Sequence, residues 1–180
     1  MKKLVLILIA ITFFTLNYSF AQNKKSASSA GGKPWGLGIK LGDPSGFTLK
    51  HYMGANAWDL TLGRSFRARK YKDYYYESGG LSATFTYQWR KPFSSTNGLE
   101  WYYGIGGQVS SRRYYKRYSN GWYDEYDSKI AAGVVGVLGL EYQIQDTPIA
   151  IFGELTPYIE LTPATLWLDV LGSVGGRIKF

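Results

Sequence analysis

Apolar and polar residues alternate along most of the chain beyond residue 34, a period of two that is typical of β-strands with one apolar face. In the clearest run, 81–90, Leu, Ala, Phe, Tyr and Trp occupy the odd positions and Ser, Thr, Gln and Arg the even ones. We predict eight strands, near residues 35–42, 47–53, 58–62, 81–90, 99–110, 132–143, 149–156 and 168–180.

Asn120-Gly121 is the strongest hairpin signal in the chain. Pairing residues whose numbers sum to 241 brings opposite charges together near this turn and apolar faces together farther along the strands. The predicted pairs are Arg117–Asp124, Lys116–Glu125, Val109–Ala132, Ile105–Gly136 and Trp101–Leu140. The same register sets Glu100 against Glu141, which is destabilising unless a basic side chain, Arg90 or Arg177, lies between them.

A second turn is predicted at Asp43-Pro44-Ser45-Gly46, where proline suits the first central position of a type I turn and glycine the bulge after it. A three-residue loop would pair Asp43 with Phe47. The same register pairs Leu41 with Leu49 and Leu37 with Met53, so that apolar faces again coincide.

The first 21 residues have the parts of a secretory signal: two lysines, an apolar run over 4–16 and small residues at Ser19 and Ala21. The run is shorter than the roughly 20 residues of a spanning helix, so we expect cleavage after Ala21. Residues 22–34 are small and polar and are predicted to form a flexible tail before a single domain, 35–180.

The composition limits the catalytic and metal-binding groups that the protein can use. There is no Cys and one His, which excludes disulfides, a thioether-linked lipid anchor and thiolate catalysis, so no metal or cofactor is expected. The 16 Tyr, 9 Phe, 6 Trp and 22 Gly suit strands joined by turns and bulges.

Three features favour a membrane barrel over a soluble one. Aromatic residues mark the ends of the apolar face: Trp35, Trp58, Trp89, Trp101, Tyr142 and Phe180. Charges of both signs on the opposite face could fill an eight-stranded lumen: Lys40, Asp59, Arg90, Glu100, Glu141, Glu154 and Arg177, with Lys50, Asp169 and Lys179. Short connections (54–57, 93–98, 144–148) alternate with long ones (65–79, 111–128), the asymmetry of outer-membrane barrels.

On these features, residues 35–180 resemble the small outer-membrane barrels of the OmpX and OmpA type and, more loosely, the outer membrane protein beta-barrel domain families. The resemblance implies an all-β, eight-stranded, antiparallel, up-and-down transmembrane barrel with periplasmic termini. A final strand ending in Ile178 and Phe180 resembles the signal read by the barrel-assembly machinery. The short first outer loop is a departure, and Pro157 is expected at the outer rim of its strand.

His51 is a candidate catalytic residue because some outer-membrane barrels are lipid A deacylases or acyltransferases. Its position in the alternation places it on the lipid face, in the periplasmic half, with no serine and acid set beside it. We therefore favour an interfacial imidazole.

The long outer connections interleave basic and aromatic residues, a combination suited to anionic or ring-bearing partners. The candidate binding residues are Arg67, Arg69, Lys70, Tyr71, Lys72, Tyr74, Tyr75, Arg112, Arg113, Tyr114, Tyr115, Lys116 and Arg117. Nearby acids weaken a nucleic-acid interpretation. The alternative is that these residues extend the strands above the membrane and contact lipids and lipopolysaccharide.

Three functions remain open: a structural or adhesive surface barrel that binds a protein by edge-strand addition, a lipid A-modifying enzyme, or an accessory subunit of an export or uptake complex. Eight strands leave no wide pore. We favour the first.

Overall fold

A computed structural model describes residues 33–65, 68–71, 75–117, 123–162 and 166–180, with only the backbone of 68–71, 75–78, 114–117 and 123–128. The predicted signal peptide, 1–21, and most of the predicted tail lie outside these residues. The strands are β1 Trp35–Gly42, β2 Ser45–Met53, β3 Asn56–Arg64, β4 Ala68–Tyr71, β5 Tyr75–Pro92, β6 Leu99–Arg117, β7 Tyr123–Gln143, β8 Ile149–Thr162 and β9 Trp167–Lys179.

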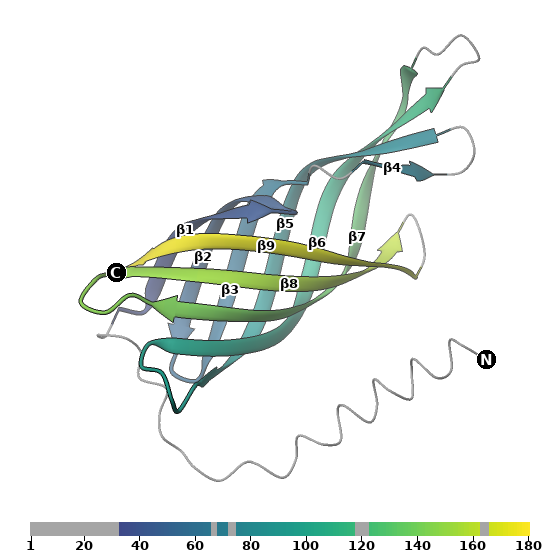
Figure 1. Ribbon diagram of the computed structural model, residues 1–180. Coiled ribbons are helices and arrows are strands. Elements are labelled where there is room, and N and C mark those ends of the chain that lie inside the picture. Colours follow the sequence, from purple (N-terminus) through teal and green to yellow (C-terminus); the bar gives the residue numbers. More distant parts are fainter. Residues whose placement is uncertain (1–32, 66–67, 72–74, 118–122, 163–165) are drawn as a thin grey trace, which may run out of the picture.

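The strands close into an antiparallel barrel (Figure 1). β1 pairs with β9, and β3 pairs with β5, so the described wall is continuous. β4 also pairs with β5, nearer the outer end of that strand, so β3 and β4 together occupy one position in the wall. The predicted eight-stranded barrel is thereby confirmed.

The polar face points inward and the apolar face outward. Lys50 and Arg177 are 0% and 2% exposed, whereas Phe47 and Leu81 are 68% and 75% exposed. A soluble barrel would bury its apolar face, so this arrangement requires a bilayer around the barrel. The protein is therefore an outer-membrane barrel. The described residues contain no helix that is long and apolar enough to cross a membrane.

Both ends of the barrel wall lie at its periplasmic rim. The N–H of Phe180 donates to the carbonyl of Trp35 at 2.9 Å, and the short connections 54–55, 93–98 and 144–148 lie at the same end. At the opposite end, β4 to β7 rise well beyond the other strands (Figure 1). Much of the predicted long loops, 65–79 and 111–128, is thus strand.

The register between β6 and β7 is as predicted over the membrane part, with Val109 opposite Ala132 and Trp101 opposite Leu140. Nearer the tip it is wrong by one residue, because a bulge lies between Tyr114 and Tyr115. There Lys116 pairs with Asp124 instead of Glu125, and Arg117 pairs with Tyr123. One extra residue on β7 accounts for the slip.

The predicted register of the first hairpin is wrong. Leu37 pairs with Leu49, not with Met53, and β2 begins at Ser45. The last β1–β2 pair is Lys40–Gly46, so the turn is centred on Asp43 and not on Ser45. It contains a cis Asp43–Pro44 peptide bond, and the Ser45 hydroxyl donates to the carbonyl of Gly42 at 2.7 Å. The shift is an even number of residues, so the apolar faces still coincide.

Pro157 lies well inside β8, opposite Val170 of β9, and not at the rim as expected. On the β7 side, the regular pairing stops at Val135–Tyr158 and resumes at Leu138–Leu155. Proline has no N–H to donate here, and a Cβ at Gly136 would approach its ring to 3.1 Å. A glycine opposite the ring thus lets the strand continue.

Candidate functional site

The periplasmic half of the lumen is organised around the Glu141 carboxylate, which is 2% exposed. It accepts hydrogen bonds from Lys50 Nζ at 3.1 Å, Arg177 Nη1 at 3.0 Å and Tyr52 Oη at 2.7 Å, and it forms an ion pair with Lys179 Nζ at 2.8 Å. Buried charges are tolerable only when they are paired and hydrogen-bonded in this way. The cluster joins β2, β7 and β9 through the barrel interior.

Arg177 extends the cluster across the lumen to Asp59 of β3, with Nη2 and Oδ2 3.1 Å apart. The hydroxyls of Thr48 and Thr61 donate to the same carboxylate. A second cluster joins Glu154 to Lys40 and to Tyr102, whose hydroxyl donates at 2.6 Å. Seven of the lumen charges predicted from the sequence thus belong to one of the two networks: Lys40, Lys50, Asp59, Glu141, Glu154, Arg177 and Lys179.

Two lumen arginines neutralise the two glutamates that lie opposite each other on β6 and β7. Glu100 lies opposite Glu141, as the register predicted. Arg90 pairs with Glu100, while Arg177 pairs with Glu141. Both candidate cations are used, one for each carboxylate.

Aromatic rings complete the filling of the lumen. Lys50 Nζ is 4.0 Å from the centre of the Tyr102 ring, and Arg177 is 3.9 Å from that of Phe152. Tyr102 in turn covers Gly139, where a Cβ would come within 2.4 Å of its Cζ. Sequence reasoning did not single out these rings, although a tyrosine on the polar face of a strand was a usable signal.

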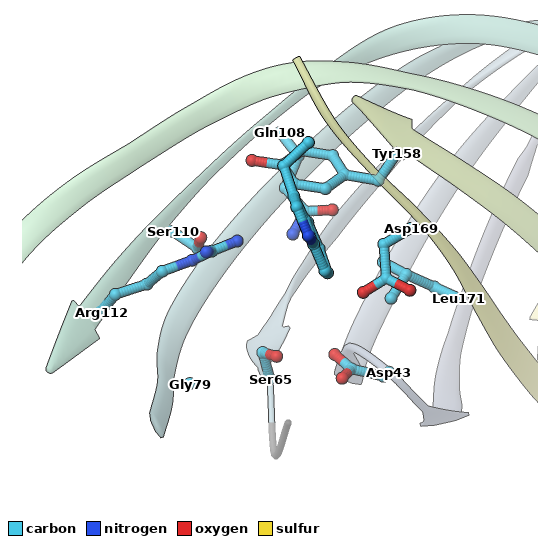
Figure 2. A pocket seen from close by; sticks show the side chains of 10 residues that line it. Asp43, Ser65, Gly79, Gln108, Ser110, Arg112, Tyr158, Asp169 and Leu171 are labelled. Atoms are coloured by element: carbon cyan, nitrogen blue, oxygen red, sulfur yellow. The ribbon is translucent and has the colours of Figure 1, made fainter. Parts of the chain in front are cut away.

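The outer mouth of the lumen is a small polar hollow (Figure 2). Arg112 and the fully buried Glu160 form an ion pair of 2.6 Å on its wall. Gln108, Tyr158 and Asp169 also line it. Its volume is about 30 Å³, room for about two water molecules, so it cannot hold an organic substrate.

This hollow changes the interpretation of Arg112. The sequence suggested a surface-loop residue, but its side chain lies at the mouth of the lumen. Glu160 was not predicted as a partner because the expected strand 149–156 ended too early, at Pro157. Within the described ranges, the acidic and histidine side chains form no group of three that could hold a metal ion.

His51 lies on the outer face near the periplasmic rim. Its ring centre is 4.3 Å from that of Trp35 and 5.5 Å from that of Trp58, its cross-strand neighbours. Trp89 and Tyr103 stack 5.5 Å apart farther around the same rim. His51 therefore belongs to an aromatic belt at the lipid–water boundary.

The predicted basic and aromatic binding residues fall on the part of the molecule that rises above the barrel. Arg69, Lys70 and Tyr71 lie on β4, Tyr75 lies on β5, and Arg113, Tyr114, Tyr115, Lys116 and Arg117 lie on β6. Arg67, Lys72 and Tyr74 fall outside the described residues. Only Arg112 and Arg113 have described side chains, and that of Arg113 is exposed.

We call the parts of β4 to β7 beyond the rim, 68–71, 75–79, 112–117 and 123–131, the protruding sheet. Within it, β5 pairs with β4 and β6, and β6 pairs with β7. β8 pairs with β7 only as far as Ala132, opposite Thr162. In the described part of the chain, Tyr123–Ala131 of β7 therefore has a strand on one side only.

The direction of the backbone groups on this open edge follows from the hydrogen bonds at the other end of β7. The N–H of Gln143 donates to Gly98, towards β6, and that of Ile144 donates to Ile149, towards β8. Directions alternate along a strand, and the β6 ladder is regular up to Asp127. The N–H and C=O groups of Ser128 and Ile130 thus point away from β6, to the open side.

No protein-family model and no curated protein matches the chain. Among solved structures, it is similar to Ail, the attachment invasion locus protein of Yersinia pestis, at 14% identity, covering 81% of this chain and 93% of that one with a TM-score of 0.48. Neisserial surface protein A gives 14% identity, coverages of 81% and 93% and a TM-score of 0.41. Acinetobacter baumannii CarO gives 11%, coverages of 82% and 98% and 0.45. Similarities this distant carry no inference about function.

Proposed function

We propose that the protein is a non-enzymatic surface barrel that binds a partner protein by adding a strand to the open edge of β7. The observation that carries the proposal is that, among the described residues, Tyr123–Ala131 has a neighbouring strand, β6, on one side only, at the far end of the barrel from the termini. An extended edge offers a ladder of N–H and C=O groups to any chain of complementary shape. The other three strands of the protruding sheet hold this edge above the lipid.

The interior supports a binding role over a catalytic one. Its charged side chains form ion pairs with one another in the lumen, and the outer mouth has room for about two water molecules. The imidazole of His51 contacts tryptophan rings on the lipid face. A lipid A deacylase or acyltransferase would need an acid and a nucleophile in contact with it.

Two further partners are part of this proposal. Basic residues near the rim, such as the exposed Arg113, suit the phosphates of outer-membrane lipids and lipopolysaccharide. Ile178 and Phe180 are 56% and 57% exposed on the outer face at the end of the last strand, where the barrel-assembly machinery could contact them during insertion.

The proposal is tested by removing a single backbone hydrogen-bond donor from the open edge. Ser128→Pro removes one N–H from the open edge and leaves the hydrogen bonds to β6 in place, because proline is tolerated on the solvent side of an edge strand. Ser128→Ala is the matched control. The probe is a phage-displayed library of random nine-residue peptides, panned against the protein in lipid nanodiscs.

We expect enriched peptides to alternate β-branched and polar residues, to bind the Ser128→Ala protein like the original, and to bind Ser128→Pro at least about tenfold more weakly, the equivalent of about 1.4 kcal/mol. Failure to enrich any peptide over empty nanodiscs would contradict the proposal. So would peptides that bind both variants equally.

A further inference from the structure

The lipid-facing surface has an apolar groove near the outer rim, over β2, β3, β5 and β6. Its floor is formed by two small outward-facing residues, Ala83 and Ser111. Larger side chains surround it, and each is at least half exposed: Phe47, Leu62, Leu81, Val109 and Ile130. The groove runs between these side chains in the outer half of the barrel.

The strand register fixes how the groove is built. Ala83 lies between its cross-strand neighbours Leu62 and Val109, so a short side chain is flanked by two longer ones. Ser111 lies opposite Ile130 in the next row towards the outside. A column of small residues between bulkier ones has the shape that an extended hydrocarbon chain fills.

Among the residues whose side chains the structure describes, one cation, Arg64, lines this groove. Arg64 is exposed on the same face as Leu62, two residues farther out along β3, and lies opposite Leu81. Two residues along a strand span about 7 Å, so its guanidinium lies at the outer lip of the groove.

A second lipid-facing groove provides a comparison within the same molecule. It crosses β8 and β9 at Gly153 and Gly176, with Ile151, Val174 and Leu140 among its walls. It is equally apolar, but no charged residue lines it. Any lipid chain could fill either groove, so Arg64 is the feature that would select a lipid with an anionic headgroup.

The two rims around this side of the barrel also differ. The periplasmic rim of β1 to β3 carries Trp35, His51 and Trp58 in ring contact. At the outer rim of β3 and β6 the outward-facing residues are Arg64 and Arg113, both exposed. Guanidinium groups bind phosphate with two parallel hydrogen bonds, whereas indoles favour an uncharged interface.

We propose that this groove is a specific site for a phosphorylated, acylated glycolipid of the outer leaflet, with one acyl chain along Ala83 and Ser111 and a phosphate on Arg64. The guanidinium supplies the charge and the hydrogen-bond donors, and the groove supplies apolar contact for the chain. The site differs from the rest of the lipid belt in joining both features. It does not depend on strand addition at β7.

The experiment is native mass spectrometry of the full-length mature protein, released from detergent and titrated with bisphosphorylated lipid A. Dephosphorylated lipid A and phosphatidylethanolamine serve as comparison lipids. Arg64→Gln removes the charge, and Ala83→Phe fills the floor of the groove. Gly172→Phe is the matched control, because residue 172 also faces outward and a Cβ there has open space, with its nearest contact at 4.0 Å.

We expect lipid A to bind the original protein and Gly172→Phe alike, and to bind Arg64→Gln and Ala83→Phe about tenfold more weakly. Dephosphorylated lipid A should bind the original protein as weakly as lipid A binds Arg64→Gln. Heat-modifiable migration on a gel verifies that each variant is folded, and Ser111→Phe replaces Ala83→Phe if that variant does not fold. Equal binding of all three lipids, or equal losses in Gly172→Phe and Ala83→Phe, would overturn the site.

Discussion

β7 passes through two different environments, the barrel wall and the protruding sheet. Residues 132–143 pair with β6 on one side and, except at 136–137, with β8 on the other. Among the described residues, Tyr123–Ala131 has only β6 as a neighbouring strand. In the wall, every backbone group must be satisfied internally, because lipid offers no hydrogen-bond partner. Above the membrane, water can satisfy an edge until a partner strand replaces it. Residues 132–143 of β7 thus contribute to the stability of the barrel, whereas the proposed partner binding falls on Tyr123–Ala131.

The largest effect is expected in the wall, from Glu141→Gln. The amide keeps the shape but leaves the cationic groups of Lys50, Arg177 and Lys179 short of a counter-charge in the buried interior. Breaking a buried ion pair from one side costs about 3 to 5 kcal/mol. We expect a loss of this size in the free energy of unfolding, measured by urea titration in lipid vesicles with tryptophan fluorescence.

Glu100→Gln is the control for that measurement. The Glu100 side chain is 14% exposed at the periplasmic mouth, and its partner Arg90 keeps a hydrogen bond to the carbonyl of Gly54 at 3.0 Å. The loss should therefore be clearly smaller than for Glu141→Gln. Equal losses would mean that the buried carboxylate with three cationic partners contributes no more to stability than its partly exposed cross-strand neighbour.

Alternation in the sequence was enough to predict the wall, because a period of two assigns each residue to the lumen or the lipid. It placed Glu141 and Arg177 on one face, and the register of the Asn120-Gly121 turn paired Val109 with Ala132 correctly. It could not predict which cation meets which carboxylate across the lumen. Those contacts depend on the curvature of the closed barrel, which brings strands distant in sequence together.

The errors came from local features that alternation does not report. The first turn is centred on Asp43 and not on Ser45, and a bulge near Tyr115 shifts the tip of the β6–β7 hairpin. Gly139 and Gly175 lie inside the predicted strands, but their positions beneath the rings of Tyr102 and Phe152 were not predicted. A glycine's role in a strand depends on its cross-strand neighbour, which single-strand patterns do not contain.

An intermediate effect is expected at these glycines, again in the wall. Gly139→Ala would set a Cβ within 2.4 Å of Tyr102 Cζ, and Tyr102 is held by its hydrogen bond to Glu154. Overpacking of this kind costs about 1 to 3 kcal/mol. Gly172→Ala, which faces open space, should leave the free energy of unfolding unchanged or slightly higher, because alanine has less backbone freedom in the unfolded chain. The same urea titration compares them, and equal stabilities would show that the ring over Gly139 can move aside.

The smallest effect on stability, and the largest on binding, is expected from shortening the protruding sheet. Replacing 114–127 with Asn-Gly joins Arg113 to its cross-strand partner Ser128 through a two-residue turn and preserves the register below it. It also keeps the ion pair of Arg112 with Glu160. Because none of the lumen ion pairs and hydrogen bonds described above involves a residue of 114–127, the free energy of unfolding should change by less than about 1 kcal/mol. The open edge is reduced to Ser128–Ala131, so peptides selected on the original protein should no longer bind. A loss of stability as large as that of Glu141→Gln would make the protruding sheet part of the barrel's structural core, and the division of β7 into a stabilising and a binding length would be wrong.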